Sequence, residues 1–316
     1  MKISVLDWST VTSDDDISPD ALKKYGNIKI FPLTPPELTV NHIGDAEIVL
    51  CNKVLITKDI IDKCPNLKYI GLFATGFNNI DIEYAKLKNI TVCNAGQYST
   101  NAVAQQVFAY ILDFANHIRN YDSAVKSGKW ENSSCFSYFP IPTTELSGKT
   151  LSVVGYGSIG KYTVEIGKTF GMNIIVSTRT RPENCPYEVT DIITAAKNAD
   201  FLTFHCPLTE QTKGIVNTKL LNVMKPSAVL INTSRGAVIN EKDLADALNN
   251  KKIAAAYLDV LDKEPMSPDT PLKTAENCII TPHTAWSAYE TRKRLFDIVC
   301  ENIRLWQNGT PQNKVN

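Results

Sequence analysis

The 316-residue chain is long enough for one large or two ordinary domains, and its 43% hydrophobic residues can fill their cores, which excludes disorder of the whole chain. Lys plus Arg and Asp plus Glu number 33 each, so no charge bias favours a nucleic-acid partner. The eight cysteines lie far apart, without a C-x-x-C pair or a histidine at zinc spacing. We interpret them as reduced thiols and predict no metal site.

The N-terminal sequence MKISVLDWST contains an apolar run that is too short for a signal sequence. No 18-residue apolar segment occurs elsewhere in the chain. We therefore expect a cytoplasmic protein without a membrane partner.

Short β-branched runs alternate with longer helical patterns in two series. The first series, within residues 2–95, is KISVLD, NIKIFP, EIVLCN, LKYIGLFA and ITVCNA. The second series is TLSVVG, MNIIVST, FLTFHCP, AVLINTS, IAAAYLDV and CIITPHT. Near-continuous apolar strands separated by helices are typical of parallel sheets covered on both faces. The pattern predicts a doubly wound α/β architecture, present twice.

Three further segments connect or follow these series. Apolar residues recur at helical spacing from about Ala102 to Val125, which predicts one long connecting helix. The segment ENSSCFSYFPIPTTELSGKT has two prolines among aromatic residues and no clear period, so we interpret it as an extended arm. The final stretch, from about Ala285, begins with a helical pattern and has no strand series of its own, so we expect it to pack on the first domain.

A glycine-rich loop follows the first strand of the second series. The segment TLSVVGYGSIGKYTVEIGKTFG places Gly155, Gly157 and Gly160 between a buried strand and a helix. These glycines permit a tight turn, close approach of the backbone to a pyrophosphate and close packing of helix on sheet. The pyrophosphate would bind at the amides near Ser158 and Ile159, at the start of the helix. The pattern predicts dinucleotide binding.

The predicted fold is therefore α/β, with two doubly wound parallel-sheet domains. A Rossmann dinucleotide-binding domain, residues 100–284, would be inserted in a flavodoxin-like substrate domain formed by residues 1–99 and 285–316.

The second strand of the predicted nucleotide-binding fold ends without the usual acidic residue. Eighteen residues past Gly160, where an Asp would bind the ribose 2′-hydroxyl, the chain has Thr178, Arg179 and, after one residue, Arg181. A charge-assisted bond from Arg to a 2′-phosphate contributes about 1.5 to 3 kcal/mol. We predict a preference for NADP(H), with NAD(H) use possible. The alternative is that both arginines are solvated loop residues and NAD(H) is used.

Three polar residues stand at or just after strand ends in the second series. Arg235 follows AVLINTS, Glu264 lies in LDVLDKEP, and His283 ends CIITPH. In open parallel sheets ligands bind at the carboxyl ends of the strands, where the glycine loop also lies, so all three could face a nicotinamide. Taken singly, each has a structural explanation: a surface charge, a turn residue and a structural histidine.

With these motifs in place, the chain strongly resembles the D-isomer-specific 2-hydroxyacid dehydrogenases along nearly its whole length. The resemblance rests on five ordered motifs, VVGYGSIG, HCPLTEQTKGIVN, INTSRGAVINEKDL, LDVLDKEP and TPHTAW. GLFATGFNNID, YSTNAVAQQVFAYIL, PTTELSGKT and TPHTAWSAYETR most resemble the glycerate dehydrogenases, also called hydroxypyruvate reductases.

The resemblance implies a role for each polar residue. His283 would donate a proton to the ketone oxygen as hydride arrives at its carbon. Glu264 would orient the imidazole and favour its protonated form. Arg235 would bind the substrate carboxylate and polarise the carbonyl, together with backbone amides around Ala74, Thr75 and Gly76.

The resemblance also implies further cofactor contacts. These would come from residues at other strand ends, namely Thr233, Ser234 and Asp259 at the nicotinamide half and His205 with Pro207 along the cleft. His205 could alternatively only cap its strand. By analogy, the helix from Ala102 and the aromatic residues Phe136, Tyr138 and Phe139 of the arm would form a twofold homodimer. Contact of the arm with the neighbour's substrate pocket and packing within one subunit both remain open.

The predicted activity is reduction of a small 2-keto acid by NAD(P)H, with hydroxypyruvate or glyoxylate giving D-glycerate or glycolate. One alternative is a dehydrogenase for another D-2-hydroxy acid, such as D-lactate. The other is a nucleotide-sensing, corepressor-like binding protein, because folds of this kind also serve that role.

Overall fold

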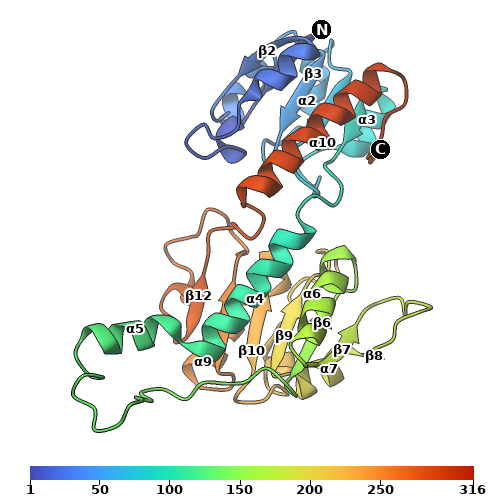
Figure 1. Cartoon of the computed structure of the whole chain (residues 1–316). Helices are drawn as coiled ribbons and strands as arrows, with labels where there is room; N and C mark the ends of the chain where they lie inside the picture. Colours follow the sequence, from blue (N-terminus) through green and yellow to red (C-terminus); the bar gives the residue numbers. More distant parts are fainter. The chain divides into compact units, whose positions relative to one another are not determined.

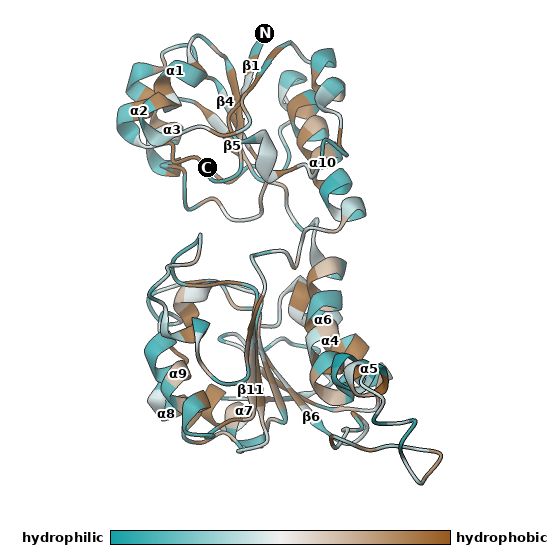
Figure 2. Cartoon of the chain, turned by 90° about the vertical axis from the view of Figure 1, so that its left-hand side faces the viewer, coloured by the Kyte–Doolittle hydropathy of each residue, from teal (hydrophilic) through white to brown (hydrophobic).

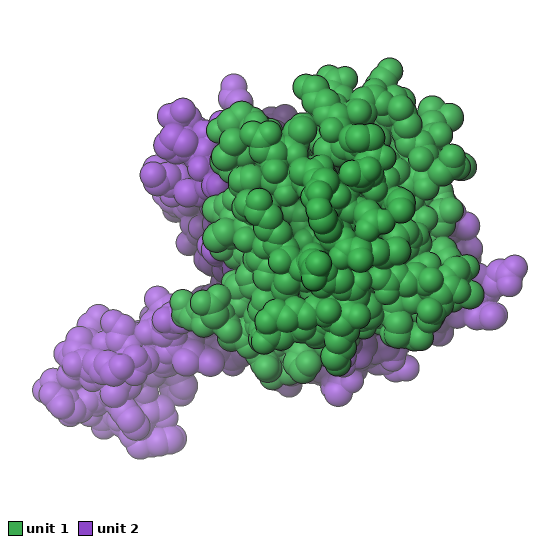
Figure 3. Space-filling model, turned by 90° about the horizontal axis from the view of Figure 1, so that it is seen from above, with its two compact units in different colours: residues 1–99, 286–316 green, residues 100–285 purple.

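The computed structural model describes all residues, 1–316. The chain divides into two compact units, which are coloured separately in Figure 3. Unit 1 contains Met1–Ser99 and Trp286–Asn316, and unit 2 contains Thr100–Ala285. The chain thus passes between the units twice. None of the helices combines the length and apolar composition that a membrane span requires.

Unit 1 is built on a five-stranded sheet with the order β2-β1-β3-β4-β5, in which every pairing is parallel. This order is that of the flavodoxin-like folds. The strands are β1 (Lys2–Val5), β2 (Asn27–Ile30), β3 (Ile48–Cys51), β4 (Tyr69–Leu72) and β5 (Thr91–Cys93). The α-helices are α1 (Thr39–Ile43), α2 (Lys58–Lys63), α3 (Ile82–Leu87) and α10 (Tyr289–Gln307), with short 3-10 turns at Trp8–Thr10, Pro19–Lys24 and Pro36–Leu38.

Unit 2 contains a seven-stranded sheet with the order β12-β11-β10-β9-β6-β7-β8, again parallel throughout. The strands are β6 (Thr150–Val154), β7 (Asn173–Ser177), β8 (Glu188–Thr190), β9 (Phe201–Phe204), β10 (Val229–Asn232), β11 (Ala255–Leu258) and β12 (Cys278–Ile280). The α-helices are α4 (Thr100–Asn116), α5 (Ile118–Lys126), α6 (Ser158–Thr169), α7 (Ile192–Asn198), α8 (Thr218–Leu221) and α9 (Glu241–Asn249), with 3-10 turns at Gly236–Val238 and Pro271–Lys273. The order reverses between β6 and β9, as in the Rossmann folds.

Helices cover both faces of each sheet (Figures 1 and 2). In unit 2, α4 and α6 lie on one face and α7, α8 and α9 on the other (Figure 2). In unit 1, α10 lies opposite α1, α2 and α3 (Figure 2). Burial on both faces explains why the central strands β9, β10 and β11 are buried at every position, and it confirms the predicted pair of parallel sheets.

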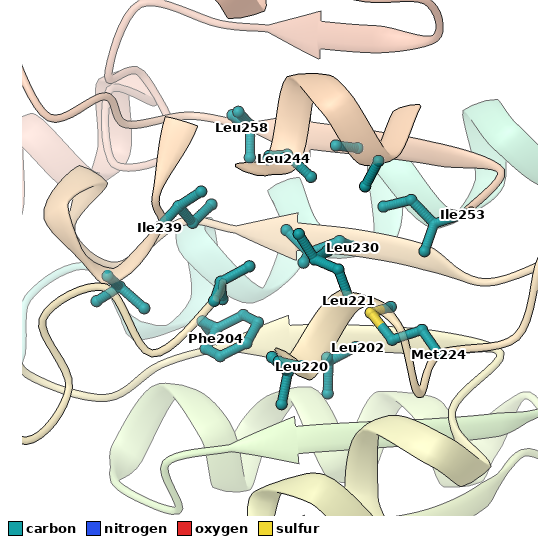
Figure 4. Packing of buried hydrophobic residues seen from close by; sticks show 14 of the residues in the cluster. Leu202, Phe204, Leu220, Leu221, Met224, Leu230, Ile239, Leu244, Ile253 and Leu258 are labelled. Atoms are coloured by element: carbon teal, nitrogen blue, oxygen red, sulfur yellow. The ribbon is translucent and has the colours of Figure 1, made fainter. Parts of the chain in front are cut away.

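The core beneath α8 and α9 supports the strand ends that matter for the site. Leu230 of β10 and Leu258 of β11 pack with Leu244 of α9 and with Ile239, which follows the β10 loop (Figure 4). All four side chains are nearly or completely buried. The loops that follow β10 and β11 therefore leave from a closely packed base.

The prediction of one continuous helix from Ala102 to Val125 is wrong. The helix stops at Asn116, and His117 adopts a left-handed conformation with φ 49° and ψ 38° before α5 begins. The returning arm bonds to both pieces, because Thr144 donates its amide to the Ala115 carbonyl and Tyr121 donates its hydroxyl to the Ile141 carbonyl. Helical spacing of apolar residues continues across a single left-handed residue, so the pattern could not reveal the break.

The arm itself, residues 131–149, contains neither helix nor strand. Together with α5 it extends away from the body of unit 2 (Figure 1). The short edge strand β8 was absent from the predicted series, because its three residues carry no apolar run.

Candidate active site

The three glycines of the loop after β6 each meet a different constraint. Gly155 has φ +99°, and a Cβ there would lie 2.7 Å from the Cys206 amide nitrogen, so the loop passes directly over the end of β9. A Cβ on Gly160 would overlap the Gly155 carbonyl oxygen. By contrast, a Cβ on Gly157 would meet no protein atom within 4 Å. Glycine at 157 is thus not required by packing inside the chain, whereas close approach of a ligand would require it.

The first turn of α6 has donor groups that the chain itself does not use. Gly157 is the N-cap residue and offers no side chain to accept a bond from the amides that follow, among them those of Ser158 and Ile159. The N-terminus of this 12-residue helix also carries a partial positive charge. The combination suits a pyrophosphate group.

The predicted 2′-phosphate residues lie beside this loop. Gly155 donates its amide to the Ser177 carbonyl at 2.8 Å, so the glycine loop is bonded to the last residue of β7, next to Thr178. Arg179 and Arg181 are exposed, and neither forms an ion pair or a side-chain hydrogen bond. Their charges are therefore not neutralised within the chain.

His205 follows β9 and lies under the glycine loop. Its amide donates to the Val154 carbonyl at 2.7 Å, and its Nε2 is 3.1 Å from the Thr203 hydroxyl. Burial lowers the pKa of His205 to about 3, so the ring is neutral near pH 7. Pro207, two residues on, is exposed and accepts a bond from the Thr212 hydroxyl.

The loop after β10 is held by Asn232, which sequence reasoning missed. The fully buried Asn232 amide accepts bonds from the Ser234 amide and hydroxyl and donates to the Arg235 carbonyl. The signal for it was a polar residue at the end of the apolar run VLIN. Thr233 Oγ1 is buried without a hydrogen-bond partner in the chain. An unpaired buried hydroxyl is costly, so this atom fits a ligand group at the site.

The guanidinium of Arg235 is half-buried and has no carboxylate partner. Its only side-chain bond is from Nη1 to the Ser234 carbonyl, at 2.7 Å. The backbone of Arg235 is extended, and a short 3-10 turn begins at the next residue. The positive charge therefore remains available for a bidentate contact with a carboxylate.

The Arg235 loop lies directly against the loop that leads to Glu264. A Cβ on Gly236 would overlap the carbonyl group of Leu261, so only glycine permits this approach. The Leu261 amide in turn donates to Glu264 Oε1 at 3.1 Å. Gly236, which was not among the predicted site residues, thus joins two of the three strand-end loops.

His283 completes the arrangement. Its Nδ1 donates to Glu264 Oε2 at 2.7 Å, and the two side chains are 28% and 34% exposed. The carboxylate fixes the tautomer and leaves Nε2, which has no partner in the chain, as the nitrogen that can exchange a proton with a ligand. The structure therefore brings Glu264 and His283 into direct contact, as the predicted roles require.

Asp259 holds the segment around His283. Its buried carboxylate accepts bonds from the amides of Thr284 and Ala285, both at 2.8 Å, and from the Thr281 hydroxyl at 2.6 Å. Its carbonyl accepts the His283 amide at 2.8 Å. Because His283 has φ +56°, a strained conformation for a residue with a side chain, these bonds account for its persistence.

The predicted substrate loop lies in unit 1, after β4. The carbonyl groups of Ala74 and Thr75 accept bonds from the Ala95 amide and the Asn94 side chain. The amides of Ala74, Thr75 and Gly76 donate no hydrogen bond within the chain. Three consecutive unpaired amides suit an anionic group such as a carboxylate.

A neighbouring loop of unit 1 is organised by Asp7, which sequence reasoning also missed. The carboxylate is 2% exposed and accepts the amides of Asn52, Lys53 and Val54, at distances from 2.7 to 3.3 Å. Asn79 links this loop to the one containing Thr75, through bonds to the Asn52 and Val54 carbonyls. Burial raises the pKa of Asp7, although these amide bonds oppose the rise. The signal was an Asp at the end of a buried strand.

Comparison with known proteins places the chain in a family. Residues 108–285 match the family model for the NAD binding domain of the D-isomer specific 2-hydroxyacid dehydrogenases. The chain is 39% identical to a hydroxypyruvate reductase of Blautia hydrogenotrophica over an alignment of length 324, with 100% of both chains covered.

Solved structures agree with this match. One is an acyclic imino acid reductase in complex with NADPH and D-Arg, with a TM-score of 0.87, 31% identity and 100% of both chains covered. Another is an NADPH-dependent glyoxylate/hydroxypyruvate reductase from Sinorhizobium meliloti in complex with NADP and malonate. Its TM-score is 0.83 at 26% identity, covering 99% of this chain and 96% of that one.

The chain belongs to the D-isomer-specific 2-hydroxyacid dehydrogenases, which confirms the resemblance drawn from its motifs. Most of its second unit matches the NAD binding domain of this family of oxidoreductases.

Proposed function

We propose that the protein reduces hydroxypyruvate to D-glycerate, and glyoxylate to glycolate, with NADPH preferred over NADH. The observation that carries the proposal is the 2.7 Å bond between His283 Nδ1 and Glu264 Oε2 at the carboxyl edge of the sheet that also bears the glycine loop. The substrate is supported by the 39% identity to a hydroxypyruvate reductase over the whole chain.

In this proposal His283 is the general acid. Its Nε2 donates a proton to the ketone oxygen of the substrate, while Glu264 stabilises the charge on the ring. The nicotinamide, when bound, supplies the hydride to the carbonyl carbon. In the reverse direction the same nitrogen removes the proton from the hydroxyl group.

Arg235 and the unpaired amides of Ala74, Thr75 and Gly76 are proposed to bind the substrate carboxylate. A planar guanidinium matches a carboxylate with two parallel bonds, which fixes the keto group relative to His283. Support comes from the absence of any carboxylate partner for Arg235 within the chain.

The proposed cofactor site uses the strand ends of unit 2. The amides around Gly157, Ser158 and Ile159 would hold the pyrophosphate, with Gly155 and Gly160 permitting the turn. The remaining proposed contacts are Thr178, Arg179 and Arg181 at the 2′-phosphate, His205 and Pro207 along the cleft, and Thr233, Ser234 and Asp259 at the nicotinamide half. The unpaired Thr233 hydroxyl and the unneutralised arginines support this assignment.

We further propose that the protein is a twofold homodimer that uses α4, α5 and the arm. Phe136 and Phe139 are 93% and 83% exposed, and Trp130 is 48% exposed. Large apolar side chains on an extended segment are typical of a surface that a second subunit covers. Light scattering should give twice the monomer mass, and Phe136→Ser with Phe139→Ser should lower it; a monomeric wild type would contradict this.

A kinetic matrix tests the activity. Hydroxypyruvate, glyoxylate, pyruvate and a bulkier 2-keto acid are each assayed with NADPH and with NADH, and the product from hydroxypyruvate is resolved for D-glycerate. Hydroxypyruvate with NADPH is expected to give the highest kcat/KM. Fast turnover of pyruvate without turnover of hydroxypyruvate would reject the substrate, and an NADH preference would reject the cofactor.

His283→Ala tests the acid–base role. Loss of a general acid costs about 10²- to 10⁴-fold in kcat, while NADPH binding measured by fluorescence should be unchanged. His42→Ala is the matched control, because His42 lies in unit 1, where its ring stacks on Phe31 and its Nδ1 is 2.9 Å from the Thr34 hydroxyl, and it has no assigned role in the site. Turnover by the His283 variant at the rate of the control would overturn the assignment.

A further inference from the structure

Helix α4 presents one buried hydroxyl among apolar neighbours, that of Tyr110. The other buried residues of this helix are Val103, Ala104, Val107, Phe108, Ile111 and Ala115. Tyr110 is 4% exposed, and its ring packs against Tyr257 with the centroids 5.2 Å apart. A buried hydroxyl must find a partner, and phenylalanine would pack as well without that need.

The partner of Tyr110 lies in the segment that carries His283. The Tyr110 hydroxyl is 2.5 Å from Thr281 Oγ1, and Thr281 Oγ1 donates to Asp259 Oδ1 at 2.6 Å. A threonine hydroxyl has a single proton, which Asp259 receives, so Tyr110 must be the donor to Thr281. Burial raises the pKa of Tyr110, which keeps this donor protonated near pH 7.

Tyr110, Thr281 and Asp259 form a chain of hydrogen bonds, which we call the relay. Asp259 is the residue through which the relay reaches His283. Its two oxygens accept the amides of Thr284 and Ala285, and its carbonyl accepts the amide of His283. His283 needs such restraint because of its positive φ. A change in the orientation of the Asp259 carboxylate would therefore move the backbone that aims the imidazole.

We propose that Tyr110 is a positioning residue for the reaction: its hydroxyl, through Thr281 and Asp259, fixes the backbone of His283 so that Nε2 is aimed at the substrate. This inference rests on the proposed function of His283 as general acid. It extends the site to α4, a helix that covers one face of the sheet.

Tyr110→Phe tests the proposal because it removes only the hydroxyl. The kcat for hydroxypyruvate with NADPH is expected to fall about three- to tenfold, which corresponds to the loss of one buried hydrogen bond. The NADPH dissociation constant and the hydroxypyruvate KM should change less than about twofold, on the order of measurement scatter in such comparisons. A primary kinetic isotope effect with deuterated NADPH should increase, because proton and hydride transfer become slower relative to product release.

Tyr257→Phe is the matched control. Tyr257 donates its hydroxyl to Asp113 Oδ2 at 2.8 Å, so its variant also loses a bond between the sheet and α4 but leaves the Thr281 relay intact. Its kcat should equal that of the wild type. Equal losses of kcat in both tyrosine variants, or an unchanged kcat in Tyr110→Phe, would overturn the proposal.

Thr281 provides a second test. Thr281→Ser retains the hydroxyl and should keep kcat near the wild-type value, whereas Thr281→Val should lower it. Tyr110→Phe combined with Thr281→Val should be no slower than Thr281→Val alone, because both act through one relay. Additive losses would contradict a shared path.

Hydrogen exchange separates this proposal from the proposed function. Amides of residues 283–285 should exchange about tenfold faster in Tyr110→Phe than in the wild type or in Tyr257→Phe, in line with the loss of about one hydrogen bond. This readout does not require turnover. If the wild type reduces no 2-keto acid, the proposed function is rejected, and the difference in exchange rate between the variants still tests the relay. If the enzyme is active but exchange is unchanged in Tyr110→Phe, only the relay is rejected.

Discussion

Gly236 and Leu261 lie so close together that a side chain on the glycine would overlap the leucine carbonyl group. This approach joins the loop of Arg235 to the loop of Glu264, whose Oε1 accepts the Leu261 amide. The relative placement of guanidinium and carboxylate therefore depends on a residue without a side chain.

Gly236→Ala should lower kcat/KM for the 2-keto acid by at least about tenfold, since a displacement of about 1 Å at a positioned group has a large effect on rate. The free energy of unfolding should also fall, because backbone must move to admit the methyl group. Gly309→Ala is the control: Gly309 has φ +78° but open space around it, so its variant should lose about 1 kcal/mol of stability and no activity. A Gly236 variant with wild-type kinetics would contradict the proposed coupling of the two loops.

Glu264→Gln should reduce kcat about 10- to 100-fold, because a neutral amide can still bond to His283 but stabilises its protonated form less well. Steady-state kinetics with saturating hydroxypyruvate and NADPH measure this change. Glu241→Gln is a matched control, since Glu241 anchors the same loop through the Asp262 amide and the Thr270 hydroxyl without contacting the imidazole. That control should show a lower Tm with kcat within about twofold of the wild type; if both variants lose kcat equally, Glu264 acts only through loop stability.

Arg179→Gln and Arg181→Gln should each raise the KM for NADPH about tenfold and leave the KM for NADH unchanged, because only NADPH carries the 2′-phosphate. Initial rates with each cofactor at fixed hydroxypyruvate give both values. Lys168→Gln removes an exposed charge of unit 2 that has no assigned contact, and should affect neither KM. Parallel effects on the two cofactors would refute a 2′-phosphate contact.

Acidification should destabilise the protein through His205. Its pKa is about 3 in the folded state and near 6.5 in the unfolded state, so below pH 6.5 the unfolded chain binds a proton that the folded chain does not. The stabilisation is thus complete above pH 6.5 and is lost as the pH falls, by about 1 to 2 kcal/mol between pH 6.5 and 5. Urea unfolding at several pH values should show a steeper loss in the wild type than in His205→Gln; identical slopes would argue against a buried neutral imidazole.

The strand-end residues could be predicted because a parallel sheet places the carboxyl ends of its strands at one edge. Arg235, Glu264 and His283 follow strands that the apolar runs reveal, and the glycine pattern lies beside the neighbouring strand. The spacing of apolar residues, with a period of two or 3.6 residues, thus predicts most of the strands and helices.

The supporting polar residues could not be predicted, because their partners are distant in sequence. Asp7 binds the amides of a loop 45 to 47 residues away, and Tyr110 bonds to Thr281 across 171 residues. An Asp or Tyr in an apolar run indicates that some partner exists, but not which one. The break at His117 was hidden for a related reason, since the bonds that accompany it come from the returning arm.

The bonds from Asp259 have a mechanical consequence, because Thr284 and Ala285 are the last two residues of unit 2 before the chain passes to Trp286. The carboxylate therefore clamps the unit 2 end of this crossing, directly after His283, the proposed proton donor.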